Sequence, residues 1–324
     1  MRKLLPLLLL LALSWSTQLR ASHLMGGEIT WTCITSGANQ GKFQFNVKLY
    51  RDCNGIPGPG SVTLQTNAPG WAGGIQCALQ TQTDISPKGP GCPTCGSPGG
   101  YPNAVEEFVY QSNPINITGV PPAGGWFFYY SDCCRNAAIT NLSNTGTGEF
   151  ILRAVMYPYN GTNTNPCYDS SPSFAERPQL ATCAGDTTYY NANAIDLELD
   201  SLVYEWGHPL AGSVYPGTNY PYAPNYAYNN PMPGPAINPQ NMSAVLNQST
   251  GVVKFKSVTA GAFVTVTKVT AYKCGIKVAE IFREIQIALI AGCNQPNVAP
   301  VFGALNTSPD IVDVAGSKYT DLID

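Results

Sequence analysis

Hydrophobic and polar side chains alternate with a period of two along much of this chain. In residues 43–49, four apolar side chains are separated by Gln44, Asn46 and Lys48. This alternation predicts a β-strand with one face in a core and the other in water. Similar patterns predict strands over residues 28–34, 61–66, 104–110, 126–131 and 150–157.

A second group of strands follows the turn at Ser170–Pro172. Two candidate strands lie within residues 187–206, one covers 251–256, and 261–290 form a long hairpin with its turn at Lys273-Cys274-Gly275. In its last strand Ile285, Ile287 and Leu289 share one face, opposite Gln286 and Ala288. No segment carries a helical stripe, so we expect an all-β protein of tandem antiparallel β-sandwich domains.

The chain begins with a secretory leader. Arg2 and Lys3 precede the apolar run Leu4–Leu13. In Leu19-Arg20-Ala21, the small residue Ala21 lies directly before the expected signal-peptide cleavage site. Residues 1–21 are therefore predicted to be a cleaved signal peptide and the protein to be secreted or extracellular. No later run reaches the roughly 20 apolar residues of a transmembrane helix.

Domain boundaries follow from the strand groups. We expect an N-terminal disulfide-containing sandwich over residues 22–170 and a second sandwich over 171–294. Residues 295–324 are expected to be the truncated start of a third module, because they are too few for a sandwich of about 80 to 100 residues. Because Asn297–Phe302 opens that module and the sequence stops at Asp324, we expect the chain to be part of a longer protein.

The composition and net charge argue against some classes of binding partner. The 324 residues include 32 Gly, 27 Pro and 18 Tyr, and only 11% are charged, about half of the usual ~25%. With a net charge of −3, the chain has no excess of positive charge that would attract nucleic acid or an anionic membrane.

Eleven cysteines follow the leader. Cys92-Pro-Thr-Cys95 and the Cys133-Cys134 pair have the spacing of a four-thiolate zinc site. An oxidising compartment favours disulfides instead. Cys183 and Cys293 flank the second predicted sandwich and are expected to bond to each other. The odd count leaves one thiol, either buried or paired outside this chain.

Three segments carry a family resemblance: Ser-His-Leu-Met-Gly-Gly-Glu-Ile-Thr at residues 22–30, Leu-Tyr-Arg-Asp-Cys-Asn-Gly at 49–55 and Asp-Cys-Cys-Arg-Asn-Ala-Ala-Ile-Thr-Asn at 132–141. They resemble the N-terminal region of large secreted surface proteins of Bacteroidetes. Such proteins continue into PKD-like, immunoglobulin-like or cadherin-like repeats, and many end in a gliding-motility-associated or type IX secretion sorting domain, which this chain lacks. The resemblance implies a cell-surface protein acting in adhesion, surface structure or gliding motility, without catalytic residues.

Three carboxylates alternate with leucines in Asp196-Leu197-Glu198-Leu199-Asp200. On a strand, Asp196, Glu198 and Asp200 would share one face at intervals of about 6.5 to 7 Å. Calcium, which takes six to eight hard oxygen ligands, would suit them. Related modules often carry Asp-x-Asp-Gly-Asp here, whereas this chain has Leu199 in place of the glycine. The alternative is an amphipathic strand with its leucines inward and its acids solvated.

A tyrosine-rich segment spans residues 207–244. A loop of this length in a compact domain is usually functional or disordered, and tyrosine faces suit contact with a sugar or peptide. Surface glycans or proteins are therefore the expected partners, although the rings could simply cover one end of the sandwich. The candidate contact residues are Tyr215, Tyr220, Tyr222, Tyr226 and Tyr228.

An enzyme is not expected. The chain has two histidines, His23 at the predicted new N-terminus and His208 at the start of the long loop, and it contains neither G-x-S-x-G nor H-E-x-x-H. Glu106 and Glu107 are adjacent and would face opposite sides of a strand. Besides an adhesive or structural segment, the sequence allows a glycan-binding accessory module of a larger secreted hydrolase.

Overall fold

The computed structural model describes residues 24–292 apart from 54, 56, 87–94, 96–103, 134, 144 and 146–148. The predicted leader and the whole predicted third module lie outside these residues. The described residues include no helix that could span a bilayer.

The described residues form strands and loops without an α-helix, which confirms the all-β prediction. The first nine strands are β1 (Leu24–Cys33), β2 (Phe43–Asp52), β3 (Ser61–Thr66), β4 (Ile75–Asp84), β5 (Val105–Ser112), β6 (Trp126–Asp132), β7 (Phe150–Met156), β8 (Ser173–Phe174) and β9 (Ala181–Cys183). The others are β10 (Thr187–Asn191), β11 (Ala194–Ile195), β12 (Ser201–Trp206), β13 (Leu210–Ala211), β14 (Thr218–Asn219), β15 (Met242–Leu246), β16 (Val252–Lys256), β17 (Gly261–Lys273) and β18 (Ile276–Ile290).

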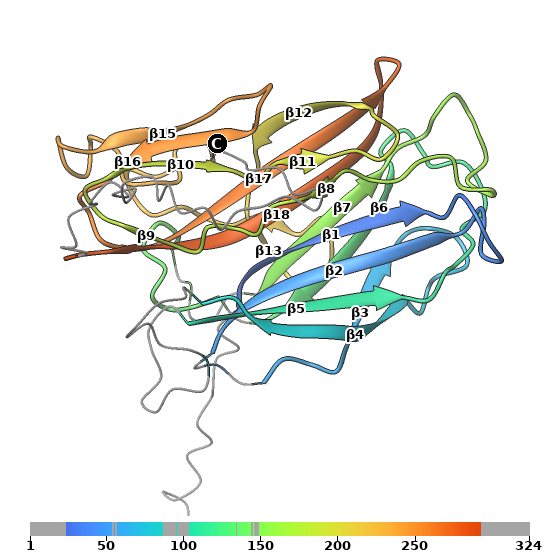
Figure 1. Cartoon of the computed structure of the whole chain (residues 1–324), viewed down its shortest axis with the longest axis horizontal. Coiled ribbons are helices and arrows are strands. Elements are labelled where there is room, and N and C mark those ends of the chain that lie inside the picture. The colour runs from blue at the N-terminus through green and yellow to red at the C-terminus, as the bar shows by residue number, and fades with distance from the viewer. Residues whose placement is uncertain are drawn as a thin grey trace, which may run out of the picture. The chain divides into compact units, whose positions relative to one another are not determined.

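One large sheet links both halves of the chain. Its order is β12-β17-β18-β1-β2-β5-β4-β3-β6-β7-β13-β14. β18 pairs along one edge with β17, and along the other edge in turn with β7, β1 and β9. The two strand systems that leave β18 through β1 and β7 face each other, because Phe45 of β2 and Phe128 of β6 lie 4.4 Å apart between ring centroids. The result is an antiparallel sandwich (Figure 1).

The alternating pattern explains the first core. Phe43, Phe45, Val47 and Leu49 of β2 are all buried, as their period of two requires. They pack with side chains from β1, β6 and β7 in one continuous cluster.

The β17–β18 hairpin is shared by two cores. Near its turn, Val269, Ala271 and Ile281 belong to the first core. Toward its open end, Phe263 and Ile285 pack against Phe255 of β16, in a separate sheet ordered β10-β16-β15.

Strand pairing crosses the predicted boundary at residue 170, since β1 pairs with β18. At this pairing Gly26 has φ +143°, and a Cβ there would lie 1.9 Å from the Glu284 carbonyl oxygen, so only glycine allows the approach. Residues 24–291 fall within one compact unit. The fold is a β-sandwich architecture, but a division into tandem domains is not confirmed.

The predicted hairpin turn is present. Cys274 and Gly275 join β17 to β18 as a two-residue loop, with φ of 51° and 81°. Two positive φ values in succession are the geometry of a type I′ turn, whose twist matches the flanking strands. Both faces of the last strand are buried, including Gln286 and Ala288, so β18 is a central strand.

Candidate functional site

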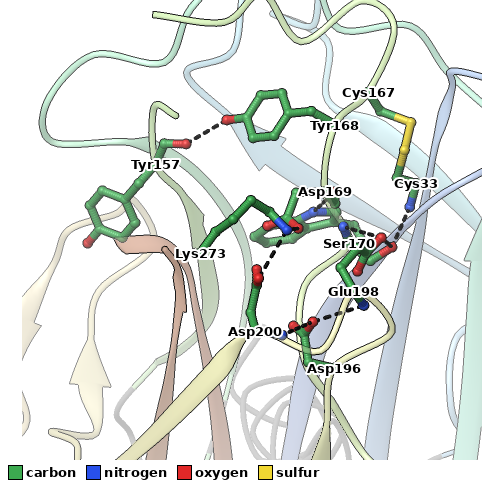
Figure 2. A network of polar contacts seen from close by, with 11 residues as sticks. Cys33, Tyr157, Cys167, Tyr168, Asp169, Ser170, Asp196, Glu198, Asp200 and Lys273 are labelled. Carbon is green, nitrogen blue, oxygen red and sulfur yellow. Dashed lines mark hydrogen bonds and ion pairs between the residues drawn. A yellow bond between two sulfur atoms is a disulfide. The ribbon is translucent and has the colours of Figure 1, made fainter. Parts of the chain in front are cut away.

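Five charged side chains meet beside the first core (Figure 2). Asp169 lies in the segment between β7 and β8. Asp196, Glu198 and Asp200 lie between β11 and β12, and Lys273 ends β17. We call this group the carboxylate–lysine cluster.

The prediction that residues 196–200 form a strand is wrong. The backbone makes a turn in which Asp196 Oδ1 accepts the N–H groups of Glu198 and Asp200, both at 3.0 Å. Leu199 has φ +63° and is 90% exposed, so it stands where a glycine would be strain-free. The leucines point to solvent and the carboxylates point inward, the reverse of the amphipathic alternative.

Each carboxylate has one engaged oxygen or ion-pair partner. Glu198 Oε1 accepts hydrogen bonds from the Ser170 N–H at 3.2 Å and the Ser170 hydroxyl at 2.9 Å. Lys273 Nζ donates to Asp200 Oδ1 at 3.0 Å. It also lies 3.0 Å from Asp169 Oδ1, an ion-pair distance without hydrogen-bond geometry.

The second oxygens have no partner. Asp169 Oδ2, Asp196 Oδ2, Glu198 Oε2 and Asp200 Oδ2 are all buried without a hydrogen bond. A buried charged oxygen without a partner is costly and therefore rare in folded proteins. Four carboxylates against one ammonium leave the cluster with excess negative charge, which protons or a cation would relieve.

The pKa values report this imbalance. Burial raises the pKa of Asp169 to about 7, against the opposing effect of Lys273. Burial also raises the pKa of Asp196 above its usual range. For Lys273, burial disfavours the charged form, but the neighbouring carboxylates of Asp169 and Asp200 outweigh it and hold the pKa above its usual range.

Asp169 is held in place by the fold. Its carbonyl oxygen accepts the Trp31 indole N–H at 3.2 Å. Two residues before it, Cys167 is disulfide-bonded to Cys33 of β1. The next residue, Ser170, accepts the Cys33 N–H at 3.0 Å. This side of the cluster is therefore fixed to β1, whereas the opposite side is an exposed turn.

We expect the Asp169→Asn variant to change how stability depends on pH. A carboxyl with a folded pKa of about 7 and an ordinary value of 3.8 binds its proton more tightly in the folded state. Its contribution is fully present below about pH 4 and is lost as the pH rises through about 7. In metal-free buffer, the wild type should lose stability relative to the variant across this window, measured by urea unfolding. Parallel pH profiles would contradict the pKa shift.

The five predicted contact tyrosines mostly pack against the protein. Tyr215 lies on Phe127 at 4.5 Å between centroids, and Tyr226 contacts Phe263 at 6.0 Å. Tyr220 is buried beneath the Arg135 guanidinium. Tyr222 is partly buried against the small apolar cluster of Ile139, Leu142, Tyr220 and Val264.

Tyr228 differs from the other four because it is substantially exposed, and it stacks on His208 at 4.0 Å. It also lines an open groove of about 170 Å³ with Tyr204, Glu205, Trp206, Asn229, Leu246 and Gln248. Ligand contact by the tyrosines stays a prediction, and Tyr228 is the ring best placed for it.

The described cysteines favour disulfides over zinc. Cys95 is bonded to Cys53, and Cys133 is also disulfide-bonded. Cys53, Cys95 and Glu106 lie close enough to share a metal, but the two sulfurs are bonded to each other. Cys92 and Cys134 lie outside the described residues. Two described thiols are free, Cys77 in the core and Cys274 on the surface.

The predicted Cys183–Cys293 bond is not tested. Cys183 is disulfide-bonded, but Cys293 lies outside the described residues.

The polar residues of the three sequence motifs have structural contacts. Glu28 and Arg283 form a buried ion pair, as do Arg135 and Glu284. Arg51 pairs with Glu106. These contacts were missed at the sequence level because each partner lies far away in the chain.

Asn141 ends the third motif and is fully buried. Its side chain donates to the carbonyl oxygens of Pro231 and Val264, both at 2.8 Å, and accepts the Val264 N–H at 2.9 Å. The amide thus fastens the motif segment to β17 and to the long loop.

No family model, curated protein or solved structure matches the chain.

Proposed function

We propose that the chain is a non-catalytic segment of a secreted or cell-surface protein that acts in adhesion, surface structure or gliding motility. The observation that carries this proposal is that polar side chains of the three sequence motifs make structural contacts. Glu28, Arg135 and Asn141 are buried in ion pairs and backbone hydrogen bonds. Groups bound in this way hold strands together and are not free to act on a substrate.

The cysteine pattern supports an extracellular setting. The Cys33–Cys167 bond closes 134 residues and joins β1 to the segment before β8. Disulfides of this kind form and persist in oxidising compartments. A stapled sheet with few charges suits a module that carries load or presents a surface.

A glycan-binding accessory module is the second candidate. It is favoured by the groove of Tyr204, Trp206 and Tyr228, in which aromatic rings stand beside the polar side chains of Glu205 and Gln248. Aromatic faces with nearby carboxylates and amides match the apolar faces and hydroxyls of sugars.

The test uses the full chain with its leader in a bacterial host. N-terminal sequencing of exported protein should begin within a few residues of Ser22. The purified protein should adhere to glycan-coated or protein-coated surfaces and leave polysaccharide and peptide panels uncleaved. Turnover abolished by one carboxylate substitution would establish an enzyme instead, and retention of Met1 on a cytoplasmic protein would contradict secretion.

Two variants separate the candidates. Tyr228→Ala and Trp206→Ala should each weaken glycan binding about two- to tenfold if the groove is the site, because a stacking contact on a ring contributes about 0.5 to 1.5 kcal/mol. Tyr189→Ala is the matched control, since Tyr189 is an exposed ring on β10 outside the groove. Equal losses in all three variants would point to nonspecific aromatic contact.

A further inference from the structure

The carboxylate–lysine cluster carries more negative charge than the protein neutralises. Asp169 and the Asp196–Asp200 turn come from separate parts of the chain and converge on the Lys273 ammonium. The Asp169 side chain is 5% exposed and that of Asp200 is 7% exposed. Asp169 is thus an almost fully buried carboxylate, and neither of its oxygens has a hydrogen-bond partner.

We propose that Asp169, Asp196, Glu198 and Asp200 bind a calcium ion, which takes the place of the Lys273 ammonium between Asp169 and Asp200. The four unpartnered oxygens are available as ligands, and the hydrogen bond lost when the ion enters is the one from Lys273 Nζ to Asp200 Oδ1. Lys273 is 17% exposed at the end of β17, so its flexible side chain can turn toward solvent when the ion enters.

Calcium fits these donors better than other common metals. All four ligands are carboxylates, whereas zinc prefers cysteine and histidine. Magnesium demands near-ideal octahedral geometry, but calcium accepts irregular sets of oxygens, with carboxylates binding through one atom or two.

Binding requires a small contraction. A calcium ion holds its oxygens at about 2.3 to 2.6 Å, which keeps neighbouring ligands close together. No three of these carboxylates have oxygens all within 4.8 Å of one another. Asp169 is fixed through Trp31, so the turn must move. The turn can do so at little packing cost, because Leu197 and Leu199 are exposed.

The test is a calcium titration of the full chain, followed by thermal unfolding and by terbium luminescence. At about a hundredfold excess over Kd, calcium chloride should raise the midpoint by about 5 to 10 °C, and magnesium chloride should have a smaller effect. Asp169→Asn and Asp196→Asn should each weaken calcium binding at least about tenfold. Having both variants keeps the test valid if one of them fails to fold.

Lys273→Met gives the sharpest result. Removing the competing ammonium should tighten calcium binding at least about tenfold and make folding depend on calcium more strongly than in the wild type. Lys268→Met is the matched control, because Lys268 pairs with the surface residue Glu205 away from the cluster. No calcium binding in either the wild type or Lys273→Met, or unchanged binding in both Asp variants, would overturn the site. Neither outcome bears on the proposed adhesive role.

Discussion

Replacing Arg283 with Met should lower the free energy of unfolding by about 3 to 5 kcal/mol, because removing one partner leaves a buried charge without its counter-ion. Arg283 and Glu28 are each 1% exposed. Arg283 also donates to the Glu176 carbonyl oxygen at 2.8 Å and to the Tyr190 hydroxyl at 3.0 Å. After the substitution, Glu28 would keep only the ion pair with Lys48 at 3.3 Å. Urea unfolding of the folded chain measures the loss.

Lys268→Met is the matched control. Lys268 also pairs with a glutamate, Glu205, but the two side chains are 23% and 43% exposed. An exposed ion pair contributes at most about 1 kcal/mol. Equal losses in the two variants would show that burial does not determine the strength of these pairs.

Removing the Cys33–Cys167 disulfide should have a second large effect. The bond closes a loop of 134 residues. In the chain-entropy model a 100-residue loop already corresponds to about 4.7 kcal/mol, and measured losses are commonly about 2 to 5 kcal/mol. The double variant Cys33→Ala/Cys167→Ala should therefore unfold at a much lower urea concentration.

Cys274→Ala provides the comparison, since Cys274 is free and exposed. It should change stability by less than about 0.5 kcal/mol. A double variant as stable as the wild type would mean that the segment before β8 is held by its hydrogen bonds to β1 alone.

The strands were predictable where alternation is strong. Residues 43–49, 126–131 and 261–290 formed strands close to the expected bounds because one or both faces are buried. β4 was missed because its later residues are mostly polar and exposed, so no alternation marks it. Sheet order and the shared hairpin were not predictable, since a period of two does not identify a strand's neighbour.

The site was predictable only in part. The three acids of the Asp196–Asp200 segment were found, but their alternation with leucines indicated a strand. The turn depends on the hydrogen bonds of Asp196 and on a left-handed Leu199, which a sequence without glycine there does not signal. Asp169 and Lys273 reach the cluster through β-sheet pairing and the disulfide, and neither has a local pattern.

The tyrosines show a related limit. Spacing and composition identify a tyrosine-rich loop but not the direction of its rings. Tyr220 turns inward, where the Arg135 guanidinium lies over its ring at 4.8 Å from the ring centroid. Tyr228 has only His208 as a stacking partner and stays exposed.

The position of β18 has a consequence for how the chain folds. β1 pairs with it at Glu28 and Arg283, 255 residues apart. Contacts of such high sequence separation slow folding, because a long loop must close before the pairing is gained. During synthesis from the N-terminus, β1 and β7 have no β18 to pair with until almost the whole described chain has emerged. The early strands therefore expose an edge of unpaired backbone N–H and C=O groups until β18 is made. A chaperone or rapid export that shields this edge would protect the chain from aggregation.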